Sequence, residues 1–352
     1  MGLKTRIKTA IIKKAIDKRK AQHPFDEVYA ETYTLPADAD SSQNNSFYFS
    51  AHNIEGESLL FRNAYRGGGR TELWVAYKDK DGNAWVNPKQ EYDNHEPTGL
   101  TITCVEPAKI WEFEFDSDLN RVRLDERRNG IPTDQTDRVK FKGRFTATAP
   151  IFEFSRHFDS LPVARALARE KFEKGFQNNL AAAHQVHYEQ SGKLTAELSI
   201  SGQTKTLTDM PTVRDHSFGT RDWAFMDRHV WIIALMENGD DLNFNAVRYP
   251  ILRELQTGYL IKGEKRVCTD FYSSMDDYEK TNDVPLAFET KVTLADGTVM
   301  TVKAEKEMEF QFAFENRVYQ FHEGIGSFDI NGVKARGIIE FGFNKDEKRW
   351  NR

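Results

Sequence analysis

Short alternating segments separated by tight turns dominate the chain from about residue 47 to residue 344. Two-residue turn signals recur at Asp81-Gly82, Ser191-Gly192, Ser201-Gly202, Asn238-Gly239, Asp296-Gly297 and Asn331-Gly332. Many short strands joined in this way are typical of a sandwich or barrel and do not suit alternating βαβ units. The pattern therefore predicts an all-β fold.

The segment IWEFEF, residues 110–115, illustrates the alternation on which this prediction depends. Side chains alternate between the two faces of a strand, so Trp111 and the two phenylalanines share one face and the two glutamates share the other. The GGG run at residues 67–69 lacks the Gly-Lys-Ser/Thr that follows in a phosphate-binding loop, and we expect a tight turn or bulge there.

One helical segment interrupts the strand pattern. Ser160 is a suitable N-cap and Pro162 suits the first turn, and apolar residues recur on one side as far as Leu180. We therefore predict four parts. They are an N-terminal basic amphipathic helix (1–24), a first lipocalin-like β-domain (25–158), a linking helix (159–183) and a second lipocalin-like β-domain (184–352). We expect the two antiparallel barrels to pack together.

Charge is distributed unevenly along the chain. The formal net charge is −5, yet residues 1–20 contain eight Lys/Arg and one Asp, a net of +7, so the remainder carries about −12. An acidic body argues against a nucleic-acid-binding surface. Leu3, Ile7, Ile11 and Ile16 fall near one stripe of the basic helix, which we expect either to touch anionic lipid or to pack on the body.

Two further features of the sequence indicate where in the cell the protein is located. Cys104 and Cys268 are the only cysteines, and each lies in a strand-like run, so we expect buried, reduced thiols. No run of 18 apolar residues occurs. The expected location is the cytoplasm, with peripheral contact at a membrane surface through residues 3–20 as a further option.

The stretch PTVRDHSFGTRDWAF, residues 211–225, combines charged and aromatic side chains. Asp215, His216 and Ser217 are consecutive, so on an extended chain they point apart and cannot form a catalytic triad. One interpretation is a buried ion-pair network of Arg214, Asp215, Arg221 and Asp222. The other is a proton donor or acceptor, His216 or Asp215, at the wall of an apolar cavity.

A second polar stretch, HQVHYEQ, occupies residues 184–190. In a strand, His187 and Glu189 share one face while Tyr188 and Gln190 share the other. His184 and His187 are separated by an odd number of residues and so lie on opposite faces, and we predict no metal site.

Three segments carry a family resemblance: HQVHYEQSGKLTAELSISG, VRDHSFGTRDW and FHEGIGSFDINGVKARGIIEFGF. Together they resemble a superfamily of tandem lipocalin-like proteins that includes the AttH-like proteins and the carotenoid hydratases called hydroxyneurosporene synthases. Fungal pericyclases of the Diels–Alderase type are more distantly similar. By this resemblance, Asp215 and His216 match an Asp-His pair at a ligand cavity, with Arg214, Trp223 and Glu189 around it, and Phe218 stands where Trp is commoner.

The leading functional prediction is a cofactor-independent enzyme that hydrates, isomerises or cyclises a hydrophobic small molecule, of isoprenoid or polyketide-like type. Glu189, Asp215 and His216 are the predicted catalytic residues. The predicted ligand-binding residues are Tyr188, Arg214, Phe218, Arg221, Trp223 and Trp231. The alternative is a lipophilic ligand carrier or sensor without catalysis. Neither hypothesis includes a metal or cofactor.

Overall fold

The structure, a computed structural model, describes residues 2–172, 174, 185–262, 265–268, 284–314 and 318–346. The chain divides into two units. The barrel unit comprises Asp26–Phe152 and Gln185–Arg221, and the open-sheet unit comprises Met1–Phe25, Glu153–His184 and Asp222–Arg352.

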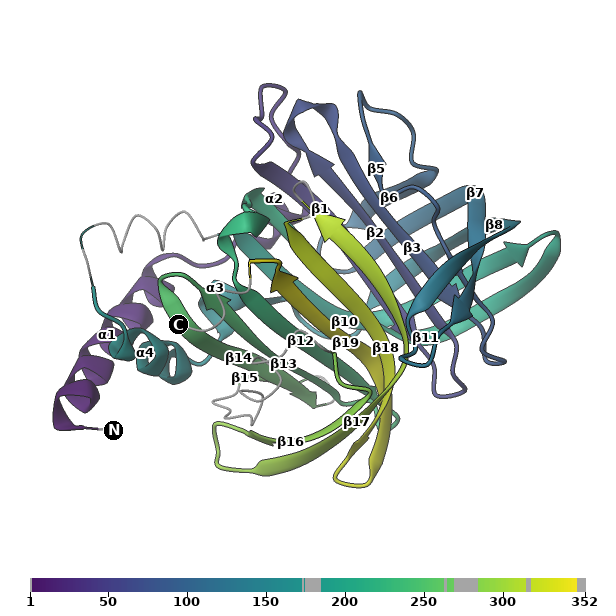
Figure 1. Ribbon diagram of the computed structural model, residues 1–352. Helices are drawn as coiled ribbons and strands as arrows, with labels where there is room; N and C mark the ends of the chain where they lie inside the picture. The colour runs from purple at the N-terminus through teal and green to yellow at the C-terminus, as the bar shows by residue number, and fades with distance from the viewer. Residues whose placement is uncertain are drawn as a thin grey trace. The chain divides into compact units, whose positions relative to one another are not determined.

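Eight antiparallel strands form a closed ring in the barrel unit (Figure 1). In order around the ring they are β11 (Gln203–Thr220), β1 (Gln43–His52), β2 (Ser58–Arg66), β3 (Thr71–Lys78), β4 (Ala84–Val86), β7 (Ile110–Leu124), β8 (Gly130–Ala147) and β10 (Val186–Ile200). The pairing of β10 with β11 closes the ring. Three short strands extend the sheet: β5 (Glu91–Tyr92), β6 (Leu100–Glu106) and β9 (Phe152–Glu153).

Aromatic side chains fill the interior of this barrel. On β7 the alternation predicted from the sequence is confirmed, because Trp111 and Phe113 are buried while Glu112 and Glu114 are exposed. Phe61 and Phe113 lie 4.7 Å apart between ring centroids. The interior of the described barrel is therefore a packed core.

The boundary between the two β-domains differs from the predicted one at residue 184. The strands β10 and β11 belong to the barrel unit, where they pair with β8 and β1. The predicted turn at Ser191-Gly192 is wrong, because both residues lie within the continuous strand β10. A Cβ on Gly192 would come 2.4 Å from the ring of Phe145, so glycine there permits close packing.

The other predicted turns are confirmed. The glycines of the remaining five turn signals have positive φ, between 84° and 88°, which favours glycine. The GGG run forms a short 3₁₀ turn, η1 (Gly67–Gly69), with φ of 76° at Gly68.

The open-sheet unit contains a second eight-stranded antiparallel sheet (Figure 1). Its order is β15 (Lys265–Cys268), β14 (Leu252–Lys262), β13 (Asp241–Tyr249), β12 (Arg228–Met236), β19 (Val333–Asn344), β18 (Tyr319–Ile330), β17 (Val299–Phe314) and β16 (Ala287–Thr293). Aliphatic and phenylalanine side chains from both halves of the sheet form its core. The all-β prediction is confirmed, with one closed barrel and one half-barrel.

Helices are few. They are α1 (Leu3–Gln22), α2 (Glu27–Glu31), α3 (Phe154–His157) and α4 (Ser160–Arg169), with a 3₁₀ turn, η2 (Trp223–Phe225). Asp159, and not the predicted Ser160, caps α4, so the observed helix begins one residue earlier than predicted. The helix also ends at Arg169 because the backbone of Glu170 is extended, and most of the predicted remainder lies outside the described residues. None of the described helices has the length and apolar character needed to cross a membrane.

The expectation of two buried thiols is met only in part. Cys104 is free and half-buried, and burial, with a smaller effect from the charge of Glu31, raises the pKa of its thiol to about 11. The side chain of Cys268 lies outside the described residues.

Candidate functional site

The pairing of β10 with β11 divides the predicted site residues between two faces of the barrel wall. Tyr188 lies opposite His216, and Glu189 lies opposite Asp215. Tyr188, His216 and Arg214 point into the barrel, whereas Glu189 and Asp215 point outward with His187. The predicted catalytic set of Glu189, Asp215 and His216 therefore does not form one cluster.

A buried carboxylate organises the interior face. Glu31, the last residue of α2, has a fully buried side chain. Nη2 of Arg214 lies 2.9 Å from both carboxylate oxygens. The Trp111 indole and the Ala108 backbone N–H each donate to Oε2 at 2.9 Å, and the Tyr188 hydroxyl donates to Oε1 at 2.6 Å. The buried guanidinium of Arg214 is thus neutralised, with Gln190 Oε1 as its second acceptor at 2.9 Å.

His216 extends this network. Its Nδ1 contacts the Tyr188 hydroxyl, and its Nε2 lies 2.7 Å from Asn45 Oδ1. The Asn45 amide donates to the Tyr33 carbonyl, which orients the Asn45 amide oxygen toward Nε2 of His216. Burial first, and then the positive charge of Arg214, hold the pKa of His216 well below its usual value. The imidazole of His216 is therefore neutral and fully buried in the wall of the barrel.

The outward face carries a second polar cluster, formed by His187, Glu189 and Asp215. His187 Nε2 contacts Asp215 Oδ2 directly, and one ligand atom from each of the three residues lies within 4.8 Å of the others. The side chain of His187 is 31% exposed and that of Asp215 is 13% exposed, so solvent reaches the pair. Burial alone would lower the pKa of His187, but the charge and hydrogen bond of Asp215 and the charge of Glu189 raise it above its usual value.

Two arginines surround this outward cluster. The charge of Arg62 interacts with that of Asp215, and Arg62 Nε donates to Ser46 Oγ at 2.9 Å. Arg221 lies close enough to oppose protonation of His187, and its Nη1 donates to Ser217 Oγ at 3.1 Å. These guanidinium groups favour an anion or a shared proton over a metal cation.

One imidazole and two carboxylates could still supply three ligands to a divalent ion. In this structure, however, His187 and Asp215 are hydrogen-bonded to each other, an arrangement that holds a proton between them. His184, the other half of the histidine pair considered from the sequence, lies outside the described residues.

The aromatic residues predicted to bind ligand are spread over both units. Phe218 is buried in the barrel unit and stacks on Tyr33 with ring centroids 4.1 Å apart. Trp223 and Trp231 belong to the open-sheet unit. Trp223 stacks on Tyr319 at 5.7 Å, and Trp231 is half-buried on β12.

Sequence reasoning missed two buried groups. Glu31 occurs in a short helix with no local motif, and its partner Arg214 is 183 residues away. In the open-sheet unit, His229 Nδ1 lies 2.7 Å from the Tyr319 hydroxyl and its Nε2 lies 2.5 Å from Glu340. A Cβ at Gly342 would come 2.1 Å from the His229 ring, and this close approach was also not evident from the sequence.

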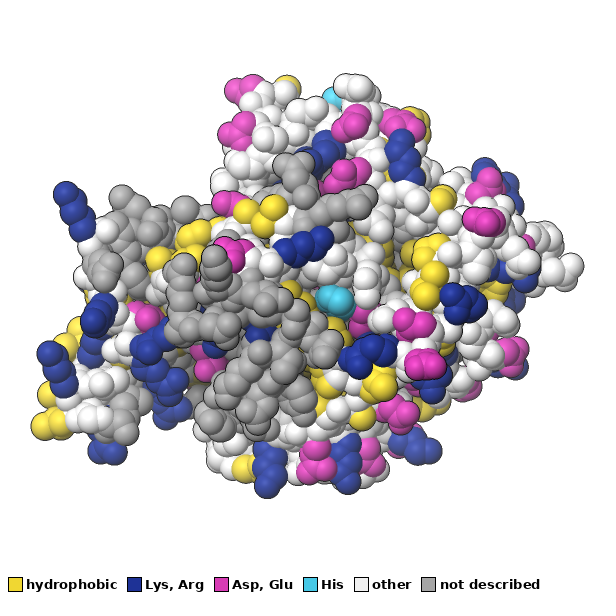
Figure 2. All heavy atoms as spheres, in the orientation of Figure 1, with side chains coloured by type: hydrophobic (Ala, Val, Ile, Leu, Met, Phe, Trp, Pro, Cys, Tyr) yellow, Lys and Arg dark blue, Asp and Glu magenta, His cyan; other side chains and the backbone are white. Residues whose placement is uncertain are grey.

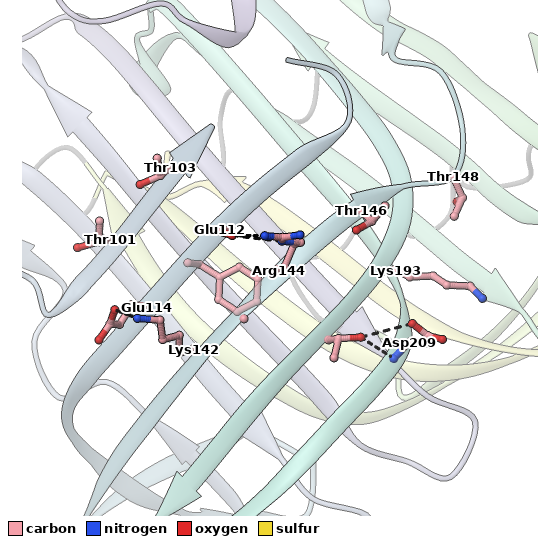
Figure 3. Close-up of a pocket in the computed structure, with 13 residues that line it drawn as sticks. Thr101, Thr103, Glu112, Glu114, Lys142, Arg144, Thr146, Thr148, Lys193 and Asp209 are labelled. Atoms are coloured by element: carbon pink, nitrogen blue, oxygen red, sulfur yellow. Dashed lines mark hydrogen bonds and ion pairs between the residues drawn. The ribbon is translucent and has the colours of Figure 1, made fainter. Parts of the chain in front are cut away.

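A cavity of about 750 Å³ lies on the barrel unit and is lined mainly by outward-facing residues of β6, β7, β8, β10 and β11 (Figure 3). Its lining is mainly threonine and charged side chains, and Arg144 pairs with Glu112 while Lys142 pairs with Glu114 across strands. None of the predicted site residues lines it. This polar hollow does not match the apolar cavity expected around residues 214–223.

The closed antiparallel barrel and the open antiparallel half-barrel give this chain a tandem lipocalin-like fold. The family model for a domain of unknown function, DUF7064, matches residues 30–345, so the chain belongs to that family. No curated protein matches the sequence significantly.

Solved structures share the fold at low sequence identity. A protein from Nitrosomonas europaea assigned as AttH aligns with a TM-score of 0.51 and 11% identity, over 90% of this chain and 99% of its own. Kievitone hydratase from Nectria haematococca aligns with a TM-score of 0.50 and 10% identity, over 92% of this chain and 97% of its own. CghA aligns with a TM-score of 0.49 and 8% identity, over 90% and 95%. These comparisons confirm the predicted lipocalin-like fold.

Proposed function

We propose that the protein is a cofactor-independent enzyme that transfers a proton to or from a hydrophobic small molecule, as a hydratase or a cyclase does. The observation that carries this proposal is the contact between His187 and Asp215, with Glu189 within 4.8 Å, on a partly exposed face. The fold shared with kievitone hydratase supports a hydratase-type reaction. An isoprenoid or polyketide-like substrate is our proposal from the sequence resemblance alone.

His187 replaces His216 as the proposed proton donor. Because the pKa of His187 is raised, the imidazole is protonated to a higher pH than an ordinary histidine and carries its proton against the Asp215 carboxylate. In a hydration, His187 would protonate one carbon of a double bond. A water molecule would then add to the neighbouring carbon, and its proton would return to the cluster.

Strand pairing fixes the geometry of the pair. Asp215 and Glu189 are directly opposite each other on adjacent strands, and His187 is two residues from Glu189 on the same face of β10. A site on paired strands holds its groups in a set position, which lowers the cost of orienting them for the reaction.

Substrate identification is the first step of the test. Protein purified from its own host is extracted and analysed by mass spectrometry for a retained apolar compound, and unsaturated isoprenoid and polyketide compounds are screened for a mass gain of one water or for isomerisation. Asp215→Asn and His187→Asn should then abolish turnover while circular dichroism remains unchanged.

Asp209→Asn is the matched control, because Asp209 is exposed on the same strand and lies outside the cluster. It should retain full activity. Full turnover in both cluster variants would refute the proposed site. A ligand that binds normally to both variants, with no turnover by any form of the protein, would identify a carrier instead.

A further inference from the structure

The helix α1 carries apolar side chains on two opposite faces, although only one of them packs on the protein. Ile12 and Ile16 are half-buried on the inner face, together with the buried Thr9. This face packs on α4, and Lys20 donates to the Phe158 carbonyl at 2.5 Å just before α4 begins. Ile16 therefore does not share the stripe predicted for it from the sequence.

The outer face of α1 exposes three large aliphatic side chains. Leu3 is 75% exposed, Ile7 is 54% exposed and Ile11 is 65% exposed. They are spaced four residues apart and so form one stripe along the helix. Near this helix, Phe172 is 53% exposed with the Lys8 ammonium 3.9 Å from its ring centroid.

Basic residues surround and continue this stripe. Lys4 and Arg6 flank its first turns, and at 100° per residue Lys14 and Lys18 continue it toward the C-terminal end. These four side chains form no ion pair with any residue that the structure describes. Figure 2 shows the result as hydrophobic and basic side chains lying side by side over α1 at the left edge of the view.

We propose that the outer face of α1, comprising Leu3, Ile7 and Ile11 with their basic neighbours, docks on an anionic lipid surface. Exposed aliphatic side chains on a helix insert at the level of the lipid headgroups, and lysine and arginine are attracted to the phosphate-bearing surface. The fixed inner face allows the helix to lie flat on the membrane without leaving α4.

Charge favours an anionic lipid surface over a second copy of the chain as the partner of this face. Two copies meeting through α1 would bring two segments of net +7 together, which is repulsive. An anionic bilayer offers the opposite charge together with an apolar layer that accepts the three aliphatic side chains. This proposal does not depend on the proposed reaction.

Co-sedimentation of the full chain with vesicles tests the proposal. One set of vesicles contains phosphatidylcholine alone, and the other contains phosphatidylcholine with 30–40% phosphatidylglycerol, roughly the anionic content needed for a strong surface potential. We expect binding to the anionic vesicles that falls at least roughly tenfold from low salt to about 0.5 M salt, because screening weakens the attraction.

The triple variant Leu3→Ser, Ile7→Ser, Ile11→Ser should reduce this binding at least roughly tenfold. The matched control replaces three other exposed apolar residues, Ile54, Val105 and Val299, with serine and should bind like the natural chain. Circular dichroism verifies that both variants fold.

Three outcomes would overturn the proposal. The first is equal binding by the triple variant and the natural chain. The second is equal binding to neutral and anionic vesicles. The third is the absence of vesicle binding together with a dimer, detected by light scattering, that the triple variant abolishes.

Discussion

Replacing Glu31 with glutamine tests whether the interior network stabilises the barrel unit. The change keeps an oxygen for the Trp111 and Ala108 N–H donors but removes the charge opposite Arg214. The side chains of this pair are 0% and 2% exposed, so the remaining guanidinium cannot regain water. Breaking a buried pair of this kind costs about 3–5 kcal/mol. At about 2–4 °C per kcal/mol for a unit of this size, Tm should fall by roughly 10 °C.

A double-mutant cycle separates the pair from its surroundings. Glu31→Gln and Arg214→Met are measured alone and together by urea unfolding followed by circular dichroism. The double variant should lose less than the two single losses added, by at least ~2 kcal/mol, since it leaves no unpaired charge. Glu114→Gln with Lys142→Met is the control, an exposed cross-strand pair that should show no measurable coupling. Additive losses at Glu31 and Arg214 would show that the two side chains are not coupled.

Three further predictions follow from the barrel unit. Asp215→Asn should lower the pKa of His187 in an NMR titration, because burial remains while the charge and hydrogen bond of Asp215 are lost. In the natural chain the pair stabilises the fold below the usual histidine pKa, and this effect is lost as pH rises through the raised pKa. An unchanged titration would contradict the pairing. Gly192→Ala should destabilise by about 1–3 kcal/mol in urea because its Cβ meets the Phe145 ring, and a neutral effect would argue against that close approach. The Asp137 carboxylate accepts hydrogen bonds from Arg121, Ser201 and Trp85, which hold its pKa well below the usual range. Asp137→Asn should therefore cost stability above about pH 4, and the difference should shrink in acid as the natural carboxylate is protonated. A difference independent of pH between 2 and 7 would contradict this.

Local patterns in the sequence were sufficient to predict much of the fold. A strand alternates its side chains with a period of two, so the faces of residues 110–115 and 187–190 could be assigned without a structure. Turn signals succeeded where glycine adopts a positive φ. They failed at Ser191-Gly192, because what requires that glycine is the Phe145 ring on β8, a partner that no local pattern reveals.

Long-range pairing limited the prediction of the site. The assignment of β10 and β11 to the first barrel depends on their partners β8 and β1, which are distant in sequence. Glu31, the shared acceptor of the interior network, is separated from Arg214 by 183 residues. Alternation did place His187 and Glu189 together, and the register then added Asp215 from the neighbouring strand.

We propose that protons are exchanged on the outward face of β10 and not inside the barrel. Once a substrate is identified, the most direct test is the incorporation of solvent deuterium into the product, compared between His187→Asn and Tyr188→Phe, which alter adjacent residues on opposite faces. We predict that His187→Asn forms no deuterated product and that Tyr188→Phe still forms it. Loss of the label in Tyr188→Phe with retention in His187→Asn would move the chemistry to the interior network and contradict the account.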